Sequence, residues 1–248
     1  FNDIDKNIEL IDLNYDESTC TQLIAPLQRK KNIKEKITND ITYWYANFEA
    51  DTSGDIHRPF MVVVQSENGK INKEYRGINC NEQLLEYLPN NAIVYFHNLA
   101  YDMRMIASYG LNKSIIKGNK VMTADIEYKN KTIHFKDTLP ILSCKLSSLP
   151  KMFNIPNIQK EIFPYKYYTI ERLNNGAIGT INEAGINEDK KWKTTDYSLF
   201  ESNIDKIKDC RIDDKHFDMW AYCSFYCQQD VNILRLGFNA FRAGFIKD

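Results

Sequence analysis

One stretch of the sequence, Tyr95-Phe96-His97-Asn98-Leu99-Ala100-Tyr101-Asp102, indicates how this chain folds. It closes a short apolar run, residues 92–96, which predicts a buried strand. It also opens a run with apolar residues at 99, 103 and 106, which predicts a helix with Asn98 as its cap. A buried strand that leads directly into a helix is typical of α/β proteins. Asn98 and Asp102 are one helical turn apart, so both are expected to face the C-terminal end of the strand.

Strand and helix patterns continue on both sides of this stretch. Residues 41–49 are rich in aromatic and β-branched side chains and predict a strand, and residues 60–65 predict a second strand antiparallel to it. Further along we expect a hairpin from 122–128 and 131–136, a short helix at 148–153 and a long helix at 217–241. Residues 175–214 are polar and irregular, and we interpret them as an insertion with one helix near 199–208. The predicted fold class is mixed α/β.

Residues 1–40 differ in character from the rest of the chain. They are polar and charged, with a basic run at 29–36, and we interpret them as a linker or the end of a preceding domain. The main domain is then expected to span residues 41–248. Because the chain begins at Phe1, we expect it to be a fragment of a longer protein.

The composition excludes several classes of function. The 32 Lys and Arg residues nearly balance the 33 Asp and Glu residues, for a net charge of -1, so any nucleic-acid contact must come from a local patch. The longest apolar run, residues 60–64, is too short to cross a bilayer, and acidic residues interrupt the N-terminus where a secretory signal would lie. We therefore expect an intracellular protein that is not bound to a membrane.

The six cysteines have irregular spacing, which favours reduced thiols over a disulfide framework. A zinc site built from Cys210, His216, Cys223 and Cys227 is the alternative, although the usual short cysteine pair is missing.

Three acids stand on apolar backgrounds in three different predicted elements: Glu49, Asp102 and Asp230. Each alone is explained by a salt bridge, a helix-dipole contact or a satisfied core pair. Together, converging carboxylates repel one another unless metal ions neutralise them, and hard oxygen ligands select Mg²⁺ or Mn²⁺. Two such ions support in-line phosphodiester hydrolysis, and Tyr226, one turn from Asp230, would orient or deprotonate the attacking water.

The motifs around these acids, in this order, resemble the 3′→5′ exonuclease domain of family B DNA polymerases, which belongs to the DEDDy group and has a ribonuclease-H-like fold. The stretch 95–102 is similar to the second exonuclease motif of the protein-primed branch, found in phages and linear plasmids, and Tyr226-x-x-x-Asp230 is similar to the third. Asn47-Phe48-Glu49 stands where the first motif has Asp-x-Glu. Two further segments, 138–142 and 160–165, resemble motifs particular to that branch. The resemblance covers residues 41–248.

The resemblance implies a role for each matching residue. Asn47, Glu49, Asp102 and Asp230 would hold two Mg²⁺ or Mn²⁺ ions, with Tyr226 on the water and Lys160 supplying positive charge at the scissile phosphate. The residues implied in binding the single-stranded 3′ end of DNA are His97, Asn98, Tyr101, Thr138, Leu139 and Tyr165. The parent protein would be a DNA polymerase primed by a terminal protein in viral, plasmid or organellar replication, with its polymerase domain absent from this fragment.

One residue departs from the family pattern: Asn47 stands in place of an aspartate. A neutral amide oxygen is a poor Mg²⁺ ligand, so we expect hydrolysis to be roughly 10²–10⁴-fold slower. Engineered inactivation and natural decay both fit, and Asp51 is expected to lie too far along the strand to compensate. Two alternatives stay open: a catalytically inactive module that binds single-stranded DNA or the terminal protein, and an RNA exonuclease of the same group.

Overall fold

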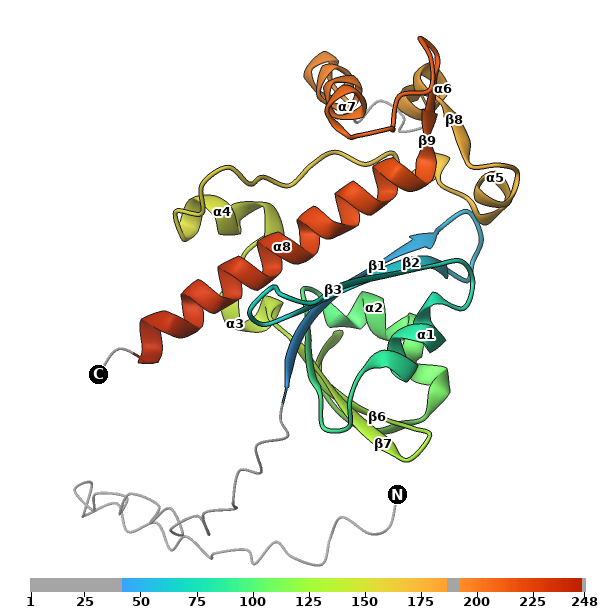
Figure 1. Ribbon diagram of the computed structural model, residues 1–248. Coiled ribbons are helices and arrows are strands. Elements are labelled where there is room, and N and C mark those ends of the chain that lie inside the picture. The colour runs from blue at the N-terminus through green and yellow to red at the C-terminus, as the bar shows by residue number, and fades with distance from the viewer. Residues whose placement is uncertain (1–41, 187–191, 247–248) are drawn as a thin grey trace, which may run out of the picture. The chain divides into compact units, whose positions relative to one another are not determined.

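The computed structural model describes residues 42–186 and 192–246 (Figure 1). They belong to one unit of the chain, residues 39–248. The predicted linker or preceding domain, residues 1–40, and its basic run lie outside the described residues. No helix of the described part is long and apolar enough to cross a membrane.

A seven-stranded mixed sheet forms the centre of this unit, in the order β3-β2-β1-β4-β7-β6-β5. The three central strands β1, β4 and β7 are parallel, and the outer strands pair antiparallel with their neighbours. The strands are β1 Tyr43–Asp51, β2 Arg58–Ser66, β3 Asn72–Arg76, β4 Ile93–Phe96, β5 Leu111–Lys117, β6 Lys120–Tyr128 and β7 Lys131–Asp137. This sheet confirms the predicted mixed α/β class, the antiparallel first pair and the hairpin around residues 129 and 130.

The central strand β1 is covered on both faces because successive side chains point to opposite sides of a sheet. Tyr45 packs in one buried cluster with residues of the C-terminal helix, whereas Trp44, Ala46 and Phe48 pack in a second cluster. The second cluster contains the buried side chains of the two helices on the other face. The sheet therefore has a hydrophobic core on each side.

Helices pack on both faces of the sheet (Figure 1). Helix α8, Met219–Ile246, crosses one face of β1 and β2, and helices α1, Cys80–Tyr87, and α2, Leu99–Ile106, lie on the other face. The long C-terminal helix predicted at 217–241 is thus confirmed, although it begins at Met219 because Phe217 belongs to a short strand, β9, His216–Asp218.

Apart from a short 3₁₀ turn that follows α2, the remaining elements connect β7 to α8. The described part of the segment predicted as an irregular insertion, residues 175–214, contains one strand and two helices, and the strand pairs with another that follows the segment. The helix predicted at 199–208 begins earlier, at Thr194. The sequence interpretation also missed β3, α1 and β5. The connecting elements are η1 Ala107–Tyr109, α3 Leu139–Leu142, η2 Leu146–Ser148, α4 Leu149–Met152, η3 Tyr165–Tyr167, α5 Ile170–Asn174, β8 Ile178–Thr180, α6 Ile181–Ile186, α7 Thr194–Lys206 and β9 His216–Asp218.

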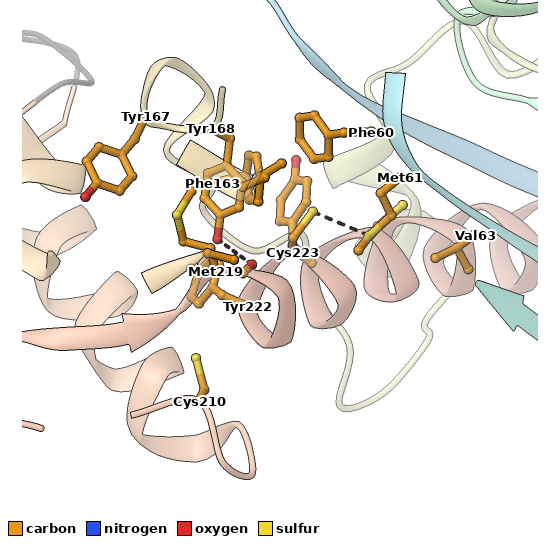
Figure 2. Close-up of a cluster of buried hydrophobic side chains, with 14 of the residues drawn as sticks. Phe60, Met61, Val63, Phe163, Tyr167, Tyr168, Cys210, Met219, Tyr222 and Cys223 are labelled. Atoms are coloured by element: carbon orange, nitrogen blue, oxygen red, sulfur yellow. Dashed lines mark hydrogen bonds between the residues drawn. The ribbon is translucent and has the colours of Figure 1, made fainter. Parts of the chain in front are cut away.

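An aromatic cluster fixes the loop before η3 onto the first turns of α8 (Figure 2). Phe163 packs 4.4 Å from Tyr168 between ring centroids, and the Tyr168 hydroxyl donates to the Met219 carbonyl at 2.8 Å. Figure 2 also shows Cys223, whose thiol lies 3.4 Å from the Met61 sulfur. This packing holds the segment that carries residues 160–165 against the helix that carries Tyr226 and Asp230.

The cysteines of the described part are free thiols, as predicted. The zinc alternative finds no support, since no group of three or more His, Cys, Asp or Glu side chains among the described residues could hold a metal ion. Instead Cys210 and Cys223 are fully buried in the aromatic cluster, and His216 pairs with Asp213.

Candidate active site

A pocket of about 230 Å³ opens where the three central parallel strands end. The strand register explains this, because Tyr45 pairs with Tyr95 and Phe96 pairs with Asp137, which brings residues 47, 97 and 138 to the same level. The carboxyl ends of parallel strands are a common place for ligand sites. The pocket is lined by Asn47, Phe48, Glu49, Ala50, His97, Asn98, Tyr101, Asp102, Leu146, Lys160, Tyr165 and Asp230.

The three acids singled out in the sequence all line this pocket, although they come from β1, α2 and α8. Glu49, Asp102 and Asp230 are each at most 5% exposed. Burial, followed by the nearby Asp230 carboxylate, raises the pKa of Glu49 to about 8, and burial holds the pKa of Asp102 well above its usual range. Buried carboxylates that line one pocket favour binding a cation.

Lys160 is the cation that the chain itself supplies. Its ammonium donates to Asp230 Oδ2 and, at 2.5 Å, to the Tyr226 hydroxyl. Burial still raises the pKa of Asp230, although Lys160 acts to lower it. The Tyr226 hydroxyl also shares a hydrogen bond with that of Tyr165, and its ring stacks on Phe163 with centroids 4.5 Å apart.

Tyr226 lies behind this network rather than in the pocket wall. Its side chain is 1% exposed, and burial and the Asp230 carboxylate hold its pKa well above the usual range. The predicted role of Tyr226 toward an attacking water stays a prediction, and Tyr226 does not line the pocket.

Asn47 faces the pocket beside Glu49. Its amide nitrogen donates to Glu49 Oε1 at 2.8 Å and lies 3.6 Å from the Cys227 sulfur, and the Cys227 thiol donates to the Asn47 carbonyl at 3.4 Å. The amide thus presents a hydrogen-bond donor to Glu49, where a carboxylate would present a second negative charge.

Asp51 does not take over the place of the missing acid. Its carboxylate accepts from the Ser53 hydroxyl at 2.6 Å and from the Ile170 N–H at 2.9 Å, and it pairs with Arg58 at 3.3 Å. Burial acts to raise the pKa of Asp51, but these partners lower it overall. All of them hold Asp51 outside the pocket, in agreement with the expectation from strand spacing.

The carboxylate oxygens in this pocket are the type of ligand that hard divalent cations prefer. Asp230 Oδ1 is buried with no hydrogen-bond partner, and such an orphaned oxygen is costly unless something positive meets it. The carboxylates of Glu49 and Asp102 are the other candidate ligands. No three such side chains of the described residues are close enough to surround one ion as they stand.

Four residues predicted to hold a DNA strand also line the pocket: His97, Asn98, Tyr101 and Tyr165. His97 is fixed by its two ring nitrogens, each 3.0 Å from a partner, the Thr138 hydroxyl and the Cys144 carbonyl. Burial lowers the pKa of His97, which favours its neutral form. The Tyr101 hydroxyl lies 3.2 Å from His57 Nδ1, and Asn98 is exposed.

The predicted capping of α2 by the Asn98 side chain is wrong. Asn98 stands at the N-cap position, but its φ is 79°, and its side chain makes no capping hydrogen bond. A capping residue normally has extended backbone, which aims its side chain at the first turn. The left-handed backbone of Asn98 leaves its amide free to face the pocket.

Thr138 and Leu139 do not line the pocket. Thr138 is fully buried, and its hydroxyl donates to the Phe96 carbonyl at 3.0 Å. Leu146, which lines the pocket from η2, was missed, and no motif in the sequence distinguishes it from an ordinary core residue.

Comparisons with known proteins agree with this architecture. Residues 83–246 match the model of the family described as DNA polymerase type B, organellar and viral. Phi29 DNA polymerase, solved with primer-template DNA and incoming nucleotides, is 15% identical with a TM-score of 0.51, over 83% of this chain and 32% of that one. The same polymerase solved with single-stranded DNA is 17% identical with a TM-score of 0.46, over 82% and 32%.

The chain therefore spans about a third of the length of these solved polymerases. No curated protein matches it. The structural likeness confirms the predicted ribonuclease-H-like fold. Because the family model covers most of the described domain, the chain belongs to the DNA polymerase type B family of organelles and viruses.

Proposed function

We propose that this chain is the 3′→5′ exonuclease domain of a protein-primed type B DNA polymerase, and that Asn47 impairs its activity. The observation that carries the proposal is the gathering of Glu49, Asp102 and Asp230 in one pocket with Lys160. Buried acids around a cleft, with shifted pKa values and an orphaned oxygen, are typical of catalytic centres. The matching family supports DNA as the substrate class.

The acidic residues would bind two Mg²⁺ or Mn²⁺ ions, with Asn47 as a weak fourth ligand. When bound, such ions supply hydroxide at neutral pH and neutralise charge on the phosphate oxygens. Lys160, next to Asp230, would offset the charge of the scissile phosphate. Tyr226 would act by holding Lys160 and Tyr165 in place, and it would reach a water only after these two side chains move.

The rest of the pocket suits a single strand. Tyr101 offers a ring for a base to stack on, and His97, Asn98 and Tyr165 line the same cavity. A frayed 3′ end is the substrate we propose, and the terminal protein is the partner we propose for the whole polymerase.

The Asn47→Asp substitution tests this function. With Mg²⁺ or Mn²⁺ and a single-stranded DNA labelled at its 5′ end, we expect the variant to produce a ladder of shortened products roughly 10²–10⁴-fold faster than the parent chain. Asn68→Asp, the same change in an exposed turn, should leave the parent rate unchanged. A folded Asn47→Asp variant that gives no ladder would contradict the proposal.

Two other readings are outcomes of the same experiment. Faster removal of nucleotides from an RNA of the same sequence would identify an RNA exonuclease, because the 2′-hydroxyl is the main local difference between the strands. Affinity for single-stranded DNA without metal, unaffected by Asp230→Ala and without any ladder, would identify a binding module. The donation of the Asn47 amide to Glu49 favours this second candidate for the parent chain.

A further inference from the structure

Asp137 lies beneath the pocket and is used by none of the motifs discussed so far. It is the last residue of β7, it pairs with Phe96 at the end of β4, and it is 3% exposed. It does not line the pocket.

One oxygen of Asp137 holds two segments at once. Its Oδ1 accepts the backbone N–H of Asn98 at 2.9 Å and the backbone N–H of Leu139 at 2.9 Å. The two N–H groups belong to the segments that follow β4 and β7. These are the segments that carry the predicted DNA-binding pairs His97 with Asn98 and Thr138 with Leu139.

Neighbouring contacts join the same two segments. The Thr138 N–H donates to the Phe96 carbonyl at 2.9 Å, and the Thr138 hydroxyl meets His97 Nδ1 at 3.0 Å. Asp137 is the only acid among these contacts, and a carboxylate accepting backbone N–H groups makes stronger hydrogen bonds than a neutral acceptor.

The bond to Asn98 also explains its backbone. A non-glycine residue in the left-handed region costs free energy and persists only where its surroundings hold it. Asn tolerates that region better than most residues, and the Asp137 carboxylate fixes the N–H of this turn. The exposed Asn98 amide and the His97 ring therefore enter the pocket from a backbone that Asp137 determines.

We infer that Asp137 is a positioning residue for the single strand: it sets the geometry of the 97–98 segment, which lines the pocket, by tying it to the buried 138–139 segment. This inference rests on the proposed exonuclease function. It predicts an effect on substrate binding more than on the chemical step, because Asp102 is held separately. The Phe48 N–H donates to Asp102 Oδ1 at 3.3 Å, and α2 is anchored by its own buried apolar residues.

The test compares variants of Asp137 in the Asn47→Asp background. We expect Asp137→Ala to raise KM for a single-stranded DNA about tenfold, with a smaller change in kcat, because two N–H groups lose their acceptor. Asp137→Asn should stay within about threefold of its parent, because its amide oxygen can accept both bonds. Asp137→Glu displaces the oxygen by one methylene and should raise KM as Asp137→Ala does. It replaces Asp137→Ala in the test if Asp137→Ala does not fold.

Asp125→Ala is the matched control, since this acid lies on the neighbouring strand β6 and pairs with His134 away from the pocket. It should leave KM unchanged. The inference is overturned if folded Asp137→Ala and Asp137→Glu both keep the parent KM, or if Asp137→Asn is as impaired as Asp137→Ala.

Failure of the proposed function is distinguishable from failure of this inference. If Asn47→Asp itself gives no ladder, the exonuclease proposal fails. Binding of a labelled single-stranded DNA, measured by fluorescence anisotropy, then decides the role of Asp137: weaker binding by Asp137→Ala than by Asp137→Asn supports it, and equal binding overturns it.

Discussion

Glu49 carries an electrostatic cost in the pocket when no cation is bound. Burial and the Asp230 carboxylate raise its pKa to about 8, whereas in the unfolded chain its pKa would be near the ordinary value of 4.5. Between these two values the native state keeps a proton that the unfolded state has lost. The free energy of unfolding of the metal-free protein should therefore fall as the pH rises through this window and level off above about pH 8.

A neutral side chain at this position should remove that loss. We expect Glu49→Gln to be more stable than the parent by about 2–4 kcal/mol at pH 9 in the presence of a chelator, and by much less at pH 5. The Gln carbonyl can still accept from Asn47, so the existing hydrogen bond is retained. Urea unfolding at both pH values measures the difference, with the exposed Glu171→Gln as the control. The explanation fails if the two stability differences are equal.

The acids of the site could be predicted one residue at a time, because a carboxylate in an apolar stretch of sequence is costly to bury and therefore indicates a functional or structural partner. Glu49, Asp102 and Asp230 satisfy this criterion, and the structure brings them together. The left-handed backbone of Asn98 could not be predicted in this way. It depends on Asp137, which is 39 residues further along the chain, and no local pattern links the two.

Strands and helices with a strong apolar pattern in their own sequence were predicted correctly, and those without one were missed. The buried strands β1 and β4 and the long helix α8 have clear apolar patterns, and they were predicted. The strand β5 is exposed at every residue, β3 has the polar sequence NKEYR, and α1 is only 8 residues long, so these elements were missed. β3 and β5 form because they pair with neighbouring strands, and that pairing cannot be read from the sequence of either segment alone.

Helix α8 meets the short helix α4 closely at Gly237. A Cβ atom built on Gly237 would lie 3.0 Å from both Cβ and Cδ1 of Leu149, whereas one on Gly244 would meet nothing within 4 Å. We expect Gly237→Val to lower the free energy of unfolding by about 1–3 kcal/mol because it overpacks this contact. Gly244→Val should be neutral or slightly stabilising, since valine is the better helix former. Denaturant unfolding of the matched pair measures this, and equal stabilities would contradict the packing argument.

At the scale of the whole described unit, the candidate site joins the two hydrophobic clusters. Asp102 belongs to α2 and its cluster, Asp230 to α8 and the cluster on the other face, and Glu49 to the strand between them. A cation held by all three would cross-link both halves of the core. Metal binding should therefore stabilise the fold as a unit, because the acids are gathered only in the native state.

Melting curves with increasing Mn²⁺ measure this coupling. At a concentration 100 times the dissociation constant, binding contributes about 2.7 kcal/mol, which raises Tm by roughly 5–10 °C in a domain of this size. We expect Asn47→Asp to show this shift at lower Mn²⁺ than the parent, because it restores a charged ligand. Adding Asp102→Asn to it should reduce the shift, while the Asn oxygen can still accept from the Phe48 N–H. Equal shifts in the single and double variants would mean that Mn²⁺ binds elsewhere, and the proposed metal site would be wrong.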